Sequence, residues 1–223
     1  MDQIEKNTVS ADNQIKESDK VSYINQYGKG KRILFVGNSI TRHGSAPEIG
    51  WYNDFGMAAS CKENDYVHLL VEKIKKTDND AVFCVCQVSN WESKYKTGNE
   101  LLGRFVDAGD FNADVIVLRL IENCPIPDFD HKVFYNEYKR LVEYLNNSGK
   151  ADVILTTGFW KHPGDSDIRC LANDCGYKCA ELGDLGEDDS MKAIGLFEHS
   201  GVANHPNDNG MRAIADRIFE LMS

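Results

Sequence analysis

Two short motifs at opposite ends of the chain contain residues that together could perform nucleophilic catalysis. Ser39 lies in the run Gly-Asn-Ser-Ile-Thr, directly after an apolar segment, and His205 lies in the run His-Pro-Asn-Asp near the C-terminus. A serine hydroxyl is a poor nucleophile unless a neighbouring base, most often histidine, accepts its proton. The pair therefore indicates a serine hydrolase, although a serine at this kind of turn is also a common helix N-cap.

A third polar residue, Asn123, follows an apolar run in the middle of the chain. Its side-chain amide and the backbone N–H of Ser39 could both donate to the charged oxygen of a tetrahedral intermediate. Loss of one such donor slows catalysis by a factor on the order of 10²–10³. The alternative for Asn123 is a loop residue that makes only local turn hydrogen bonds.

Apolar runs of strand length alternate with segments of helical periodicity along the chain. The predicted strands are residues 32–36, 81–88, 114–120, 152–157 and 193–197. The predicted helices are residues 65–76, 99–108, 132–147, 168–182 and 208–222, and Gly176 is expected to interrupt the fourth of them. This alternation predicts an α/β fold, a three-layer α/β/α flavodoxin-like sandwich with a five-stranded parallel sheet. Residues 1–30 are expected to form an N-terminal extension, either disordered or packed on the body, and residues 31–223 a single domain.

The candidate residues occupy equivalent places relative to the predicted strands. Ser39, Asn90, Asn123, Trp160 and His205 follow the first to the fifth strand in that order. In open α/β sheets the ligand site lies beyond the carboxyl ends of the strands. We therefore expect all five side chains to meet at one edge of the sheet.

Composition limits the possible partners and compartments. The chain has 25 Lys and Arg against 35 Asp and Glu, and its net charge of -10 argues against nucleic acid or an anionic membrane as a partner. No run is apolar enough to span a bilayer, and residues 1–20 lack the apolar core of a signal peptide, so we expect a cytoplasmic protein. The seven cysteines form no C-x-x-C pair, which favours reduced thiols over a metal site.

Taken together, these motifs resemble those of the SGNH hydrolases, also called the GDSL-like esterase superfamily. Residues 37–41 resemble the first block of that family, usually Gly-Asp-Ser, with Asn38 in place of the aspartate. Residues 121–123 resemble the third block, usually Gly-x-Asn, with Ile121 in place of the glycine. The resemblance covers residues 32–222, and it implies that Ser39 is the nucleophile and Asn123 an oxyanion donor.

Residues 205–210 resemble the fifth block of the family, and this resemblance implies that His205 is the base. The family usually has an aspartate three residues before this histidine, and the present chain has Val202 there. A catalytic histidine needs a partner that fixes its tautomer. The backbone carbonyl of Val202 is one candidate, and the side chains of Glu198 and Asp208 are two others.

The second block of the family contributes a glycine whose backbone N–H donates to the oxyanion. Residues 89–92, Ser-Asn-Trp-Glu, occupy that region here, and we take Asn90 as the candidate second donor. Between the third and fourth predicted strands, Glu122 is expected to form an ion pair with Arg42 or Arg119 beneath the site.

The resemblance implies hydrolysis of a carboxylic ester, often an acetyl group on a carbohydrate, with no metal or organic cofactor. Residues 47–56 form an aromatic, glycine-rich insertion, and aromatic rings beside carboxylates suit stacking on sugars. Trp51, Asp54, Trp160 and His162 are therefore candidate substrate contacts, unless these aromatic rings simply pack on the domain. Two other functions remain open: an acyltransferase or thioesterase with the same site, and a non-catalytic module that binds glycans or nucleotides. The oligomeric state is not predicted by any of these patterns.

Overall fold

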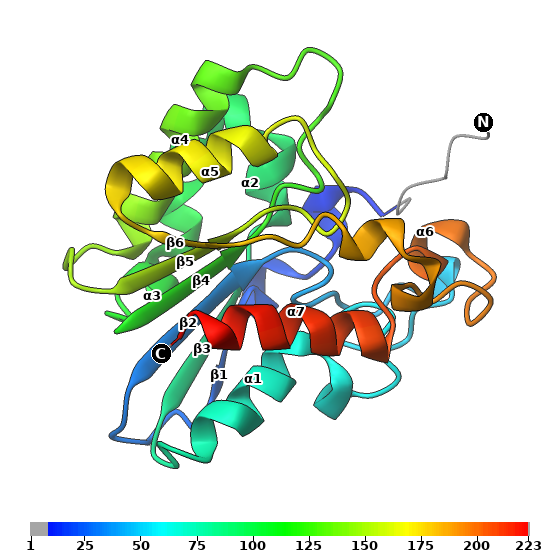
Figure 1. Cartoon of the computed structure of the whole chain (residues 1–223), viewed down its shortest axis with the longest axis horizontal. Helices are drawn as coiled ribbons and strands as arrows, with labels where there is room; N and C mark the ends of the chain where they lie inside the picture. Colours follow the sequence, from blue (N-terminus) through cyan, green and yellow to red (C-terminus); the bar gives the residue numbers. More distant parts are fainter. Residues whose placement is uncertain (1–8, 223) are drawn as a thin grey trace.

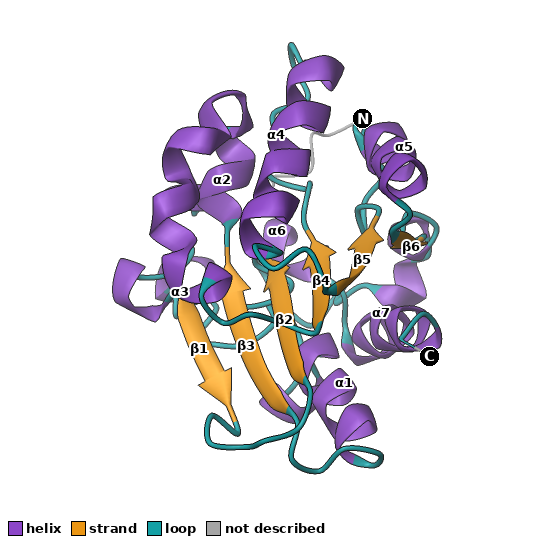
Figure 2. Cartoon of the chain, turned by 90° about the vertical axis from the view of Figure 1, so that its left-hand side faces the viewer, coloured by secondary structure: helices purple, strands orange, loops and turns teal. Residues whose placement is uncertain are grey.

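The computed structural model describes residues 9–222 of the chain, and its centre is one six-stranded sheet (Figures 1 and 2). The strands are β1 (Val21–Ile24), β2 (Arg32–Gly37), β3 (Val82–Gln87), β4 (Val115–Arg119), β5 (Asp152–Thr156) and β6 (Lys178–Ala180). They lie in the order β1-β3-β2-β4-β5-β6. Strands β2 to β6 pair in parallel, and β1 pairs antiparallel with β3 at one edge. The predicted α/β sandwich is confirmed, with one strand more than expected.

Helices cover both faces of this sheet (Figure 1). The α-helices are α1 (Tyr66–Lys75), α2 (Ser89–Ser93), α3 (Val106–Gly109), α4 (His131–Leu145), α5 (Asp165–Cys175), α6 (Ser200–Ala203) and α7 (Asp208–Glu220). The 3-10 helices are η1 (Ala11–Asn13), η2 (Glu17–Asp19), η3 (Pro47–Ile49), η4 (Lys62–Asn64), η5 (Tyr95–Phe105), η6 (Leu185–Glu187) and η7 (Asp189–Met191). α1 and α7 pack on one face, and α2 to α5 pack on the other. Across residues 9–222, no helix has both the length and the apolar character that crossing a bilayer requires.

Packing on both faces of the sheet explains why the strands are continuous apolar runs in the sequence. In β2, Ile33 and Phe35 pack with α1 and α7, while Leu34 and Val36 pack with α4 and α5. Successive side chains of a strand point to opposite faces, so a strand that is covered on both faces needs apolar residues at every position.

Two predicted elements near the C-terminus are wrong. Residues 193–197 form no strand: Gly195 has φ +81 in the left-handed region, and Ile194 and Leu196 are exposed. The fifth parallel strand is instead β6, inside the segment over residues 168–182 that was predicted as a helix with an interruption at Gly176. The helix α5 stops there because Gly176, with φ +70, forms a left-handed C-cap.

The N-terminal part of the chain packs on the domain wherever the structure describes it. β1 adds to the sheet through antiparallel pairing with β3. Residues 9–20, called the N-terminal segment below, precede this strand, and within them Gln14 and Ile15 are buried. The backbone carbonyl of Lys20 accepts a hydrogen bond of 2.9 Å from the N–H of Gln87, the last residue of β3. The segment therefore begins its path to the sheet at the carboxyl end of β3.

Strand order places a crevice at the carboxyl ends of β2 and β4. The chain leaves β2 to form β3 on one side, and then crosses back to form β4 on the other side. Connections that diverge in this way leave a space between them, which is the usual ligand site of open α/β sheets. Ser39 follows β2 and Asn123 follows β4, so both lie beside this switch point.

Candidate active site

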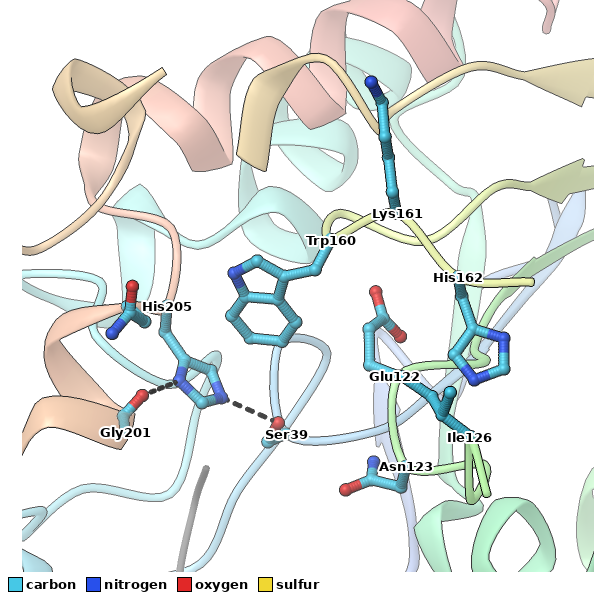
Figure 3. Close-up of a pocket in the computed structure, with 10 residues that line it drawn as sticks. Ser39, Glu122, Asn123, Ile126, Trp160, Lys161, His162, Gly201 and His205 are labelled. Atoms are coloured by element: carbon cyan, nitrogen blue, oxygen red, sulfur yellow. Dashed lines mark hydrogen bonds between the residues drawn. The ribbon is translucent and has the colours of Figure 1, made fainter. Parts of the chain in front are cut away.

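A pocket of about 260 Å³ lies beyond the carboxyl ends of β2, β4 and β5 (Figure 3). Its walls come from the loops that follow these strands and from the segment around α6. The residues that line it are Ser39, Glu122, Asn123, Ile126, Trp160, Lys161, His162, Gly201, Asn204 and His205. The sequence candidates Ser39, Asn123, Trp160, His162 and His205 are therefore brought together.

Ser39 and His205 are in direct contact, although 166 positions separate them in the sequence. The hydroxyl oxygen of Ser39 lies 2.9 Å from Nε2 of His205, and Nδ1 of the same ring lies 2.7 Å from the carbonyl oxygen of Gly201 (Figure 3). A carbonyl oxygen can only accept, so Nδ1 carries the proton. In the neutral ring, Nε2 then presents its lone pair to the Ser39 hydroxyl.

The group that orients His205 is thus the carbonyl of Gly201, and none of the three predicted partners does so. The Val202 carbonyl already accepts the backbone N–H of His205 at 2.9 Å, because the chain turns tightly at the end of α6. Asp208 accepts hydrogen bonds from the N–H and hydroxyl of Ser60, and Glu198 is exposed. No carboxylate contacts the His205 ring among residues 9–222.

The His205 ring is buried, with 3% of the residue exposed. Burial penalises the charged imidazolium and lowers the pKa of His205 to about 3, against an ordinary value of 6.5. The Trp160 ring contributes to this burial, because it meets the imidazole edge-on with 5.1 Å between ring centres. The ring is therefore neutral near pH 7, as a proton acceptor must be.

Ser39 lies on a tight turn that starts where β2 ends. A Cβ atom on Gly37 would lie 2.7 Å from the carbonyl oxygen of Arg119, so only glycine allows this approach of β2 and β4. The turn is closed by the Thr41 N–H, which donates to the carbonyl of Asn38 at 2.9 Å. The Ser39 N–H itself has no hydrogen-bond partner among residues 9–222 and is available to a ligand.

A buried polar network lies directly beneath this turn. Arg119, fully buried at the end of β4, donates from Nη1 to Glu122 at 2.5 Å and from Nη2 to Oδ1 of Asn38. The expected ion pair of Glu122 therefore forms with Arg119 and not with Arg42. Nδ2 of Asn38 in turn donates to Glu122 at 2.7 Å and to Glu92 at 2.9 Å. Asn38 thus bridges the buried guanidinium and two buried carboxylates.

Glu92, in α2, is the second carboxylate of the network and is fully buried. It accepts the N–H of Ile121 at 2.5 Å and Nδ2 of Asn123 at 2.7 Å. Burial, reinforced by the nearby charge of Glu122, raises the pKa of Glu92 above its usual value. Burial alone would do the same to Glu122, but the Arg119 guanidinium outweighs it and holds the pKa of Glu122 low. The network thus contains one charged pair, Arg119 with Glu122, and one carboxyl that is more easily protonated, that of Glu92.

The remaining candidates differ in where their side chains lie. Asn90 is buried in α2 away from the pocket, and its side-chain amide has no partner within residues 9–222. Trp51 is buried in a separate apolar cluster with Val202, where it supports α6. Asp54 is exposed and faces Arg42 at 3.6 Å. None of these three candidates lines the pocket.

Trp160 and His162 follow β5 and form one wall of the pocket. The loop that carries them is anchored by the Phe159 N–H, which donates to Glu122 at 2.9 Å. Both ring nitrogens of His162 are engaged: Nε2 lies 3.1 Å from the carbonyl oxygen of Cys124, and Nδ1 accepts the Gly164 N–H at 3.1 Å. His162 therefore presents its ring, rather than a free nitrogen, to a ligand.

Three contributors were not recognised from the sequence: Glu92, Gly201 and Gln14. Gly201 acts through its backbone carbonyl, and every residue has one, so no sequence motif singles it out. Glu92 lies in the run Ser-Asn-Trp-Glu that follows β3, and a carboxylate so soon after a buried strand was the available signal. Gln14 lies in the N-terminal segment, and Nε2 of its side chain donates to Oδ1 of Asn123 at 3.1 Å.

Comparisons with known proteins identify the fold. No family model matches the sequence, and no curated protein matches it significantly. The psychrotrophic esterase EstA from Pseudoalteromonas sp. superposes with a TM-score of 0.56 at 16% identity, over 86% of this chain and 96% of that one. A lipolytic protein of the G-D-S-L family from Desulfitobacterium hafniense gives 0.52 at 14% identity, over 86% and 99%. The chain has the fold of the SGNH hydrolases.

A further structural neighbour is a two-domain esterase, CEX, described as active on acetylated mannans. It superposes with a TM-score of 0.57 at 18% identity, over 93% of this chain. The chain described here spans only 56% of the length of that two-domain esterase. At such identities these similarities establish the fold alone. The chemistry depends on which residues line the pocket.

The buried network predicts that Asn38→Asp destabilises the protein. An aspartate would lose both hydrogen bonds donated by the amide and would add a third carboxylate around a single guanidinium. Leaving such a charge uncompensated typically costs about 3–5 kcal/mol. We expect a loss of this size in the free energy of urea unfolding at pH 7. The exposed substitution Asn79→Asp, which should change it by less than about 0.5 kcal/mol, is the matched control. An equal effect of both substitutions would contradict the network.

The lowered pKa of His205 predicts a pH-dependent contribution to stability. Between pH 6.5 and about 3, the unfolded chain binds a proton at this ring that the folded chain does not bind, so stability falls as pH falls. From pH 7 to pH 5 the wild type should lose about 2 kcal/mol more than His205→Asn. Urea unfolding at pH 7, 6 and 5 measures this difference. His43 is present in both proteins, so its own lowered pKa cancels. Parallel curves would show that His205 is not held neutral by the fold.

Proposed function

We propose that this protein is a serine esterase in which Ser39 is the nucleophile and His205 the general base. The observation that carries the proposal is the 2.9 Å contact between the Ser39 hydroxyl and Nε2 of His205, whose other nitrogen is held by Gly201. A hydroxyl in contact with the lone pair of a buried, neutral imidazole is the arrangement that activates a serine. The esterases and lipolytic proteins among the structural neighbours share this fold.

The reaction would proceed by acyl transfer through a covalent intermediate. As the Ser39 oxygen attacks the ester carbonyl, its proton passes to Nε2 of His205. The imidazolium is stabilised by the Gly201 carbonyl, which accepts its Nδ1–H, and it then gives the Nε2 proton to the leaving alcohol. Water, activated by the same nitrogen, attacks the acyl-enzyme and releases the acid. No residue other than His205 needs to move a proton in this sequence.

The oxyanion would lie between the Ser39 N–H and the side-chain amide of Asn123. The Ser39 N–H makes no hydrogen bond within the described part of the chain, and Asn123 lines the pocket across from His205 (Figure 3). Nδ2 of Asn123 donates one of its two hydrogens to Glu92, which leaves the other for a ligand. Two aimed donors of this kind are a typical oxyanion hole.

The substrate class that fits best is a small acyl ester, most simply an O-acetyl group, on a carbohydrate. The pocket of about 260 Å³ accommodates an acetyl group and part of its alcohol. The Trp160 ring beside the His205 imidazole offers an aromatic surface where the sugar of the leaving group would lie (Figure 3). Activity on acetylated mannans in the neighbour CEX supports the same choice.

The proposal is tested with Ser39→Ala, His205→Ala and the double variant, assayed on p-nitrophenyl acetate and on acetylated oligosaccharides. Because the two residues act as one unit, each single substitution should remove nearly all activity, on the order of 10⁴-fold or more, and the double should lose little beyond that. His131→Ala, which changes an exposed histidine on α4, should retain full activity. Independent losses that multiply in the double variant would contradict the Ser–His unit.

A further inference from the structure

The N-terminal segment reaches the candidate oxyanion donor through a single side chain, that of Gln14. Only 1% of this glutamine is exposed. Its Nε2 donates to Oδ1 of Asn123 at 3.1 Å, and its Oε1 accepts from Nε2 of Gln87 at 3.0 Å. A side chain from residues that precede the domain core thus bridges the carboxyl ends of β3 and β4.

The direction of each hydrogen bond in this bridge is fixed. Oε1 of Gln87 accepts the N–H of Ser89 at 3.2 Å, so the nitrogen of the Gln87 amide must face Gln14. Gln14 therefore turns its oxygen to Gln87 and its nitrogen to Asn123. A backbone N–H, which can only donate, thereby sets the orientation of two successive side-chain amides.

Asn123 is held from both sides as a result. Glu92 accepts from Nδ2 at 2.7 Å, and Gln14 donates to Oδ1. If the amide rotated by half a turn, its oxygen would face the carboxylate of Glu92 and its NH₂ group would face the NH₂ group of Gln14. The two contacts together therefore select the single orientation in which the donor side of the amide is available.

The position of Gln14 is itself secured by the backbone around it. The carbonyl of Gln14 accepts the N–H of Gly44 at 2.7 Å, and the carbonyl of Ala11 accepts the hydroxyl of Ser89 at 2.6 Å. The segment is thus bonded to the loop that follows β2 and to the first residue of α2. A glutamine held in this way loses little conformational freedom when it holds Asn123 in turn.

We propose that Gln14 is a positioning residue for the reaction, and that the N-terminal segment is a functional part of the active site through it. The inference rests on the proposed function, in which Asn123 donates to the oxyanion. Gln14 acts through Asn123 and does not touch the substrate: it is absent from the lining of the pocket.

A double-mutant cycle between Gln14→Met and Asn123→Ala tests this proposal. Methionine keeps the length and packing of the glutamine but cannot donate. We expect Gln14→Met to lower kcat by about 10-fold or more with little change in KM, since a misplaced catalytic group can cost up to about 10²-fold. In the Asn123→Ala background the same substitution should change kcat less than 2-fold. Equal factors in both backgrounds would overturn the proposal, because a merely structural role would act without regard to Asn123.

A matched control changes the same segment without touching the bridge. Asp12→Asn removes an exposed ion pair with Lys94, and such pairs contribute little to stability. This variant should leave kcat unchanged, and thermal unfolding of all variants shows whether each is folded. A loss of kcat in Asp12→Asn as large as that in Gln14→Met would overturn a specific role for the glutamine.

The hydrogen bond itself is measured without catalysis. In ¹⁵N NMR spectra, the two side-chain amide protons of Asn123 are identified as the pair that disappears in Asn123→Ala. Gln14→Met should shift these signals and speed their exchange with water, whereas Asp12→Asn should not. If the wild type hydrolyses no ester, the proposed function fails, and these signals still decide whether Gln14 orients Asn123. Unchanged amide signals in Gln14→Met would overturn the positioning role whatever the kinetics.

Discussion

A single buried guanidinium organises the carboxyl edge of the sheet. Arg119 ends β4 and is paired with Glu122, and Asn38 after β2 connects this pair to Glu92 in the helix that follows β3. Glu122 also accepts the backbone N–H of Phe159 after β5. The loops after four adjacent strands are thereby tied to one network, and each of them contributes to the pocket or supports a residue that does. Burial of these charges is tolerable only because every carboxylate oxygen has donors around it.

The same network accounts for the departure of this chain from the usual first block. A carboxylate at position 38 would face two others, whereas the asparagine has an oxygen for Arg119 and an NH₂ group for the two glutamates. The surroundings of His205 are different, because no carboxylate contacts its ring within residues 9–222. There a backbone carbonyl fixes the tautomer, and burial keeps the ring neutral. Charge is thus concentrated beneath the serine and absent beside the histidine.

The sequence predicts the parts of this structure that depend on local pattern. The strand over residues 32–36 and the helices over residues 65–76, 132–147 and 208–222 follow from apolar periodicity, and all of them form. The parallel sheet then implies that residues after its strands converge, as Ser39, Asn123 and Trp160 do. The strand predicted over residues 193–197 is wrong because an apolar run that contains Gly195 resembles a strand in sequence, whereas Ile194 and Leu196 are exposed in a loop.

Other features could not be predicted because they arise from contacts between distant segments. β1 is four residues long and exists through its pairing with β3, about 60 positions away. The choice of the Gly201 carbonyl over that of Val202 depends on which carbonyl the turn after α6 has already used. Gln14 reaches Asn123 across 109 positions. Each of these depends on tertiary geometry that periodicity and motif spacing do not encode.

The central claim is that the fold activates Ser39, and covalent labelling tests it most directly. The purified protein is treated with a fluorophosphonate, which reacts with activated serines, and the intact mass is measured beside that of Ser39→Ala. The account predicts one stoichiometric adduct in the wild type and none in the variant, with both proteins shown to be folded. A folded wild type that gains no adduct, or an adduct that persists in Ser39→Ala, would contradict it.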